Sequence, residues 1–99
     1  MKSYKTTLYY LTSSGERYNG TFKITPDEVI FEAQMHLASS GIQDVEGEIR
    51  IAREDITELK PFRNNLIFNR LRIKEKSGTV HVFDRGISSF RSILKRLRA

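Results

Sequence analysis

The chain contains no cysteine, and this absence excludes a disulfide framework, a thiolate zinc site and a dithiol redox motif. It also lacks any run of about 18 apolar residues, so we expect no membrane-spanning helix. The segment from Met1 to Thr6 is too polar to begin a secretory signal. Together these absences predict one small domain over residues 1–99, located in the cytoplasm or peripherally on a membrane.

Catalytic signatures are also absent. The chain has no glycine-rich phosphate loop, no nucleophile elbow and no HExxH pattern. Its two histidines, His36 and His81, are too few and too far apart for a zinc site, which needs three or four ligands at short spacings. Acidic neighbours such as Asp27 and Glu28 belong to turns and are expected to be solvated. We therefore predict a non-enzymatic protein with no metal and no cofactor.

The net charge of +5 is distributed unevenly along the chain. Residues 1–59 carry six basic and ten acidic side chains, whereas residues 60–99 carry eleven basic and two acidic ones. One interpretation is a set of solvated faces whose charges are partly balanced in the fold. The other is a surface that binds anions, such as lipid head groups, an acidic protein or nucleic acid.

Short segments of alternating polarity recur along most of the chain, the pattern of an all-β barrel or sandwich. Turn-forming residues separate them, among them Pro26 and the Asn64–Asn65 pair, which is predicted to close a hairpin. Residues 35–47 lack the alternation and are predicted to form a long irregular loop. Seven strands are expected, at residues 6–11, 17–24, 28–34, 48–52, 56–62, 69–75 and 79–83.

The periodicity changes to that of a helix after Gly86. Apolar residues follow the i, i+3, i+4, i+7 spacing, and Ser88 or Ser89 is positioned to cap the helix. A basic amphipathic helix is also found at membrane surfaces, but here we predict that it covers the open end of a barrel. The expected buried residues are Ile87, Phe90, Ile93, Leu94 and Leu97, and the polar face carries Arg91, Lys95 and Arg98.

The order of these elements resembles a known family. The segments Gly20–Thr25 and Val29–Phe31 are similar to the opening of GRAM domains, which belong to the pleckstrin-homology-like superfold. The stretch from Ile49 to Ile56 is similar to the family's next strand and corner, and Leu71–Ile73, Gly78, Val82–Phe83 and the final helix complete the likeness. The resemblance implies a seven-stranded, two-sheet, partly open barrel capped by one helix. It implies a binding or regulatory role and no activity.

The hairpin at residues 11–18 departs from the phosphoinositide-binding members of that superfold. It offers Glu16 and Arg17 in place of their cluster of basic residues, so no phosphoinositide specificity is implied.

The basic C-terminal half holds the candidate binding residues. Arginine binds phosphate in a bidentate manner, which suits an anionic surface. We predict contact with an anionic membrane or an acidic protein. The alternative is a protein-interaction or self-assembly domain, and nucleic-acid binding ranks third because exposed aromatic residues for base stacking are not evident. The predicted contact residues are Arg63, Arg70, Arg72, Lys74, Lys76 and Arg85.

The predicted loop at residues 35–47 is a second candidate. Its apolar residues Met35, Leu37 and Ile42 are expected to be exposed, and exposed apolar clusters mark contact surfaces. The sharper hypothesis is docking of a partner or of a second copy of the chain, with the acidic half of one copy against the basic half of the other. The alternative is a mobile loop without a role.

Overall fold

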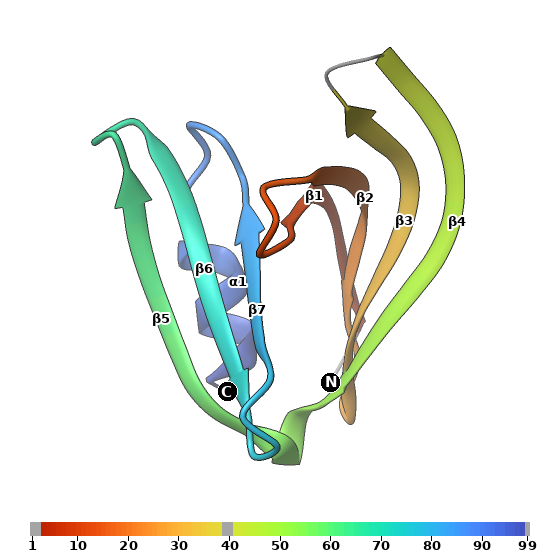
Figure 1. Cartoon of the computed structure of the whole chain (residues 1–99). Helices are drawn as coiled ribbons and strands as arrows, with labels where there is room; N and C mark the ends of the chain where they lie inside the picture. Colours follow the sequence, from red (N-terminus) through yellow and green to blue (C-terminus); the bar gives the residue numbers. More distant parts are fainter. Residues whose placement is uncertain (1–2, 39–40, 99) are drawn as a thin grey trace.

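The computed structural model describes residues 3–38 and 41–98. The described residues form one antiparallel sheet of seven strands, in the order β4-β3-β2-β1-β7-β6-β5, and one α-helix (Figure 1). The mainly β class and the C-terminal helix are therefore confirmed, as are seven strands. The elements are β1 (Tyr4–Leu11), β2 (Arg17–Ile24), β3 (Glu28–Ala38), β4 (Gly41–Ala52), the 3₁₀ turn η1 (Arg53–Asp55), β5 (Ile56–Asn64), β6 (Phe68–Glu75), β7 (Val80–Asp84) and α1 (Arg91–Leu97).

The sheet is bent, and its two edge strands follow one another in the chain. η1 connects β4, at one edge, to β5, at the other, so the chain crosses the whole sheet at this corner (Figure 1). β1 pairs with β2 over its full length but with β7 only from Tyr9 to Leu11. This short ladder joins the part of the sheet built from β1–β4 to the part built from β5–β7.

The prediction of an irregular loop at residues 35–47 is wrong. β3 continues to Ala38 and β4 begins at Gly41, with Met35 opposite Asp44 and Leu37 opposite Ile42. A register shift between Ala33 and Met35 interrupts the pairing, and such a bulge also interrupts a period of two. No described residue at the far end of this hairpin is buried, so neither face of the ribbon requires a regular alternation of apolar residues.

The core lies between the bent sheet and α1. Its largest side chains come from both parts of the sheet, as in the contact between Phe22 and Phe83, whose ring centroids lie 5.0 Å apart. As predicted, the C-terminal segment contributes Phe90, Ile93 and Leu94, which are buried, and Leu97, which packs against them.

Two details of the predicted helix are corrected. α1 begins at Arg91, and Ile87 lies before it with 82% of its surface exposed. The N-cap residue is Phe90, which makes no side-chain capping hydrogen bond, so neither serine is the cap; the Ser89 Oγ accepts a hydrogen bond from the Arg91 N–H at 2.9 Å. At the other end the Arg53 guanidinium donates to the carbonyls of Arg96 and Leu97, in the last turn of the helix.

Gly20 is the one position in β2 where no other residue fits. A Cβ there would lie 2.2 Å from the carbonyl oxygen of Glu32 and 2.8 Å from the Phe31 ring. β3 therefore approaches β2 more closely at this point than any side chain would allow, next to the register shift between Asn19 and Gly20.

Candidate functional site

The six predicted contact cations lie on or next to β5, β6 and β7. Arg70, Arg72 and Lys74 project from one face of β6, whereas Leu71 and Ile73 between them are fully buried, as the alternation predicts. Arg63 is near the end of β5, Lys76 is in the β6–β7 turn, and Arg85 follows β7.

Arg70 is held by a buried carboxylate. Its Nε donates to Asp84 Oδ2 at 3.0 Å, and Asp84 is completely buried. Asp84 also accepts the Gly86 N–H at 2.7 Å, and the guanidinium of Arg17 approaches it to 3.8 Å. Because it neutralises this carboxylate, Arg70 has a structural role.

Three more of the six cations have protein partners. Arg72 lies 3.5 Å from Glu58, and Lys76 lies 3.9 Å from Asp55. Arg85 donates to the Tyr4 hydroxyl, to Thr6 Oγ1 and to the carbonyl of Ser89, and so ties β1 to the chain that leads into α1. A hydrogen bond with Ser92 and the charge of Arg85 lower the pKa of the Tyr4 phenol. Within residues 3–38 and 41–98, only Arg63 and Lys74 of the six have no acidic or hydrogen-bonding partner.

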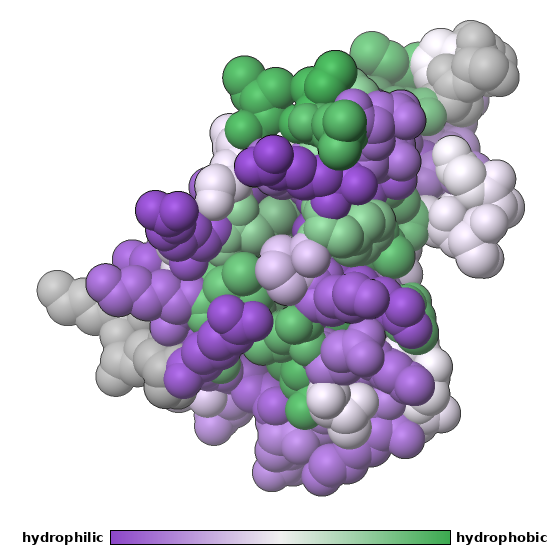
Figure 2. Space-filling view, turned by 90° about the vertical axis from the view of Figure 1, so that its left-hand side faces the viewer, coloured by the Kyte–Doolittle hydropathy of each residue, from purple (hydrophilic) through white to green (hydrophobic). Residues whose placement is uncertain are grey.

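An exposed apolar surface lies beside Arg63 at the end of the β5–β6 hairpin. We define this apolar tip as Leu66, Ile67, Phe68 and Ile87, which are 85%, 58%, 37% and 82% exposed. The Asn69 N–H donates to the Gly86 carbonyl at 2.7 Å and its side chain donates to the Ile87 carbonyl, which brings Ile87 to the hairpin. Figure 2 shows these hydrophobic residues gathered at the upper end of this side of the molecule.

The hairpin turn presents Leu66 in an unusual backbone conformation. Asn65 and Leu66 have φ angles of 54° and 61°, and the Ile67 N–H donates to the Asn64 carbonyl. This left-handed pair is the geometry of a type I′ turn, in which Asn and Gly are favoured at the two positions. Asn65 fits that preference and Leu66 does not.

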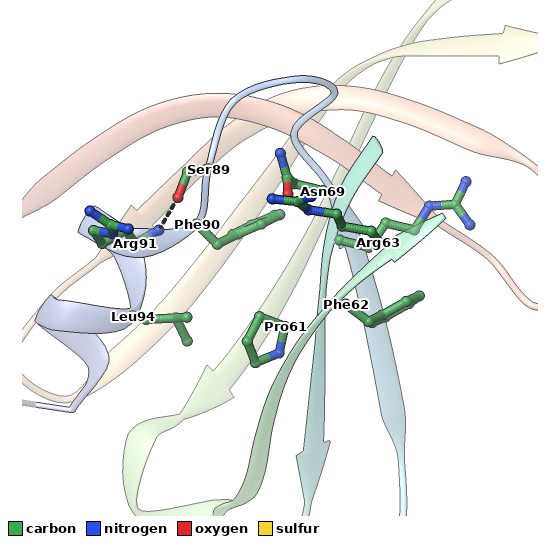
Figure 3. Close-up of a pocket in the computed structure, with 9 residues that line it drawn as sticks. Pro61, Phe62, Arg63, Asn69, Ser89, Phe90, Arg91 and Leu94 are labelled. Atoms are coloured by element: carbon green, nitrogen blue, oxygen red, sulfur yellow. Dashed lines mark hydrogen bonds between the residues drawn. The ribbon is translucent and has the colours of Figure 1, made fainter. Parts of the chain in front are cut away.

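Next to the tip, a groove runs between β5 and α1. Its volume is about 320 Å³, and Pro61, Phe90 and Leu94 supply apolar walls. Figure 3 shows Pro61 and Phe62 on opposite sides of β5, with Pro61 facing the helix. Arg63 and Arg91 also line this β5–α1 groove, and neither side chain has a partner in the described part of the chain.

The sequence predicted only part of this site. Arg63 was among the predicted contact residues, and Arg91 was assigned to the polar face of the helix, which is correct. The apolar tip was not predicted, because residues 66–68 were assigned to no element. The signal was present: three consecutive apolar residues follow an Asn–Asn pair that predicts a turn.

The second candidate set lies in the strands of the β3–β4 hairpin. Met35 and Leu37 belong to β3 and Ile42 to β4, where it is 69% exposed. Leu37 and Ile42 are directly paired, so they share one face of the ribbon. Of the three residues expected to be exposed, only Ile42 is, whereas Met35 and Leu37 are half-buried.

Each histidine has a local partner. The ring of His36, in β3, stacks on Tyr18 with a centroid distance of 4.6 Å. His81 is buried in β7, where Nε2 is 2.8 Å from Glu75 and Nδ1 is 3.2 Å from the Tyr10 hydroxyl. Over the described residues, no three His, Asp or Glu side chains lie close enough to hold a metal ion.

The comparisons with known proteins establish the fold alone. No family model and no curated protein matches the chain. The crystal structure of the C-terminal domain of an unknown protein from Leishmania infantum is similar, with a TM-score of 0.72 and 14% identity. The match covers 96% of this chain and 79% of that one. In the part of the chain that the structure describes, no helix is long and apolar enough to cross a bilayer.

Proposed function

We propose that this domain is a non-catalytic, pleckstrin-homology-like module of the GRAM type that attaches peripherally to anionic membranes on their cytoplasmic side. The strand order and the terminal α1 support the family proposal. Within it, β1–β4 and β5–β7 are the two sheets of a partly open barrel, and the short β1–β7 ladder is their junction.

The observation that carries the proposal is Leu66. Its left-handed backbone is unfavourable for a side chain with a Cβ by about 1 kcal/mol or more, and its side chain is 85% exposed. Neither feature stabilises the fold, since Leu66 belongs to no part of the core. Residues with strained backbone conformations cluster at functional sites. Insertion of the side chain into the interfacial region of a bilayer gives Leu66 such a function.

The charge around the apolar tip favours an anionic bilayer. Arg63 and Arg91 have no acidic partner among the described residues, and all but two of the charged side chains in residues 60–99 are basic. A basic residue near an anionic membrane contributes about 1 kcal/mol, and this attraction falls off within a Debye length. An acidic protein would use the same cations, but it gives no reason for a protruding tip.

Co-sedimentation with vesicles tests the proposal. The domain should bind vesicles of phosphatidylglycerol more tightly than vesicles of phosphatidylcholine, and the difference should shrink as salt rises. Replacing Leu66 and Ile67 with Ser should weaken binding at least tenfold, because a buried Leu side chain contributes about 1.5–3 kcal/mol. The double change Arg63→Gln and Arg91→Gln should weaken it and flatten its salt dependence.

Ile42→Ser is the matched control, because Ile42 is as exposed as the tip but lies on the acidic half. It should leave vesicle binding unchanged. Equal losses from the tip variant and from Ile42→Ser would contradict the proposal, as would equal binding to the two lipids.

A further inference from the structure

A second cavity lies in the other half of the molecule, on the concave side of β1–β4. Its volume is about 350 Å³, and three aromatic residues line it: Tyr10, Tyr18 and Phe31. Ala33 and Gly47 are directly paired across β3 and β4. They are the next pair on the same face of the sheet after the larger residues Phe31 and Ile49. Because the paired side chains become small at this point, the space they would have filled remains open. We call this space the aromatic hollow.

Both charged residues that line the aromatic hollow, Glu46 and Glu48, are acidic. Glu48 lies between Gly47 and Ile49 in β4, so its side chain is on the opposite face of the strand, where it is ion-paired with Arg50. Glu46 has no partner in the described residues and is the carboxylate that remains available. Glu16 adds a third carboxylate, which accepts a hydrogen bond from the Tyr18 hydroxyl at 3.1 Å. The β5–α1 groove, of similar size, is lined by arginines, so the charged residues that line the two cavities are opposite in sign.

The polar atoms of the aromatic residues are already in use. The Tyr10 hydroxyl hydrogen-bonds with His81 Nδ1, and burial raises the pKa of this phenol. With the Tyr18 hydroxyl bonded to Glu16, the two phenols offer ring surface and no free donor. Such a site does not suit an anion or a sugar, both of which require donors.

We propose that the aromatic hollow binds a trimethylammonium group. A cation without N–H bonds needs no acceptor geometry, and it is attracted by the electron-rich faces of aromatic rings and by nearby carboxylates. The apolar contacts with Ala33, Ile49 and Phe31 suit its methyl groups. This inference is independent of the membrane proposal, which concerns the opposite edge of the sheet.

Titration with choline, followed by the amide signals of residues 45–49 in NMR spectra, tests the proposal. The dissociation constant should be on the order of 1 mM, as expected of so small a ligand. The neutral isostere 3,3-dimethylbutan-1-ol has the same shape without the charge, and it should bind about tenfold more weakly or worse. Equal affinity for the two compounds, or no response to choline at 50-fold that concentration (about 50 mM), would overturn the proposal.

Variants locate the site. Gly47→Val adds a side chain beside Ala33, where an added Cβ would meet only the Ala33 Cβ, at 4.0 Å. Its methyl groups should occupy the hollow, and choline binding should be lost. Glu46→Gln should weaken binding several-fold, whereas Glu54→Gln, on the distant η1 corner, should not change it. If the Gly47→Val variant does not fold, the Glu46→Gln and Glu54→Gln variants still test the proposal. Equal choline affinities of these two variants and the parent would show that choline does not bind in the aromatic hollow.

Phosphatidylcholine vesicles present the same group at a bilayer. If Gly47→Val reduces binding to them, the source of the ligand is a lipid head group. If free choline binds and vesicle binding is unaffected by Gly47→Val, the source is a soluble compound. The tip variant with Leu66 and Ile67 changed to Ser should keep its affinity for choline, so failure of either proposal is distinguishable from failure of the other.

Discussion

The two edge hairpins of the sheet, β3–β4 and β5–β6, differ in what accompanies their exposed apolar residues. Ile42 in β4 lies beside acidic residues such as Asp44 and Glu46, whereas Leu66 and Ile67 between β5 and β6 lie beside Arg63. Both edge strands have residues that disfavour pairing with a further strand. β4 has charged side chains, and β5 has Pro61, a residue that within a sheet is found mainly on edge strands. Exposed apolar residues at the two edges are therefore expected to contact different partners, because the charges around them differ in sign.

The two parts of the sheet nevertheless share one core, and the largest expected effect tests this. Phe90→Ala should lower the free energy of unfolding by about 3–5 kcal/mol, because Phe90, which immediately precedes α1, belongs to the same buried cluster as Phe22 and Ile51. Chemical denaturation followed by circular dichroism measures the change. Ile87→Ala, in the same segment but exposed, should change stability by less than about 0.5 kcal/mol.

If one part of the sheet in the Phe90→Ala variant unfolds at a lower denaturant concentration than the other, β1–β4 and β5–β7 are separate folding units. A single transition in both the variant and the parent is the expected result.

A buried carboxylate also links the two parts. Asp84 of β7 is within reach of Arg17 of β2 and Arg70 of β6. Asp84→Ala should reduce the free energy of unfolding by about 2–3 kcal/mol, because the Arg70 guanidinium and the Gly86 N–H both lose their hydrogen-bond acceptor. Glu58→Ala removes the partner of Arg72 in an exposed ion pair and should reduce it by less than about 1 kcal/mol. Similar losses in both variants, measured by urea denaturation, would show that Asp84 has no special place between the two parts.

The fold followed from the sequence wherever one face of a strand is buried. β2 has the predicted bounds, and the alternation of Leu71 and Ile73 with Arg70 and Arg72 placed β6 correctly. The prediction was wrong at residues 35–47, where none of the described residues is buried and strand formation depends on pairing between β3 and β4. Such pairing depends on the neighbouring strand, so the polarity pattern of one segment does not reveal it.

The candidate site was predicted less completely than the fold. The charge balance identified the basic half, but the pairing of Arg72 with Glu58 and of Arg70 with Asp84 depends on the register of β5, β6 and β7. That register decides which cations remain available, and single-sequence patterns do not contain it. The hydrogen bonds of Asn69 with Gly86 and Ile87 help to bring the segment before Arg91 to the hairpin that carries the apolar tip and Arg63.

The smallest expected change in stability comes from substitutions to Asn at the exposed apolar residues of the two hairpins, where stability and vesicle binding should change independently. Leu66→Asn places a residue that tolerates φ near 61° in the turn, so the unfolding free energy should rise by about 0.5–1 kcal/mol. Binding to phosphatidylglycerol vesicles should fall in the same variant, because the side chain proposed to enter the bilayer is gone. Ile42→Asn should show the reverse pattern: a small loss of stability, since a β-branched residue leaves a strand, with unchanged vesicle binding. Thermal denaturation and vesicle co-sedimentation of the two variants measure both quantities. A Leu66→Asn variant that is less stable than the parent would mean that Leu66 supports the fold, and the argument from its strained backbone to membrane binding would then fail.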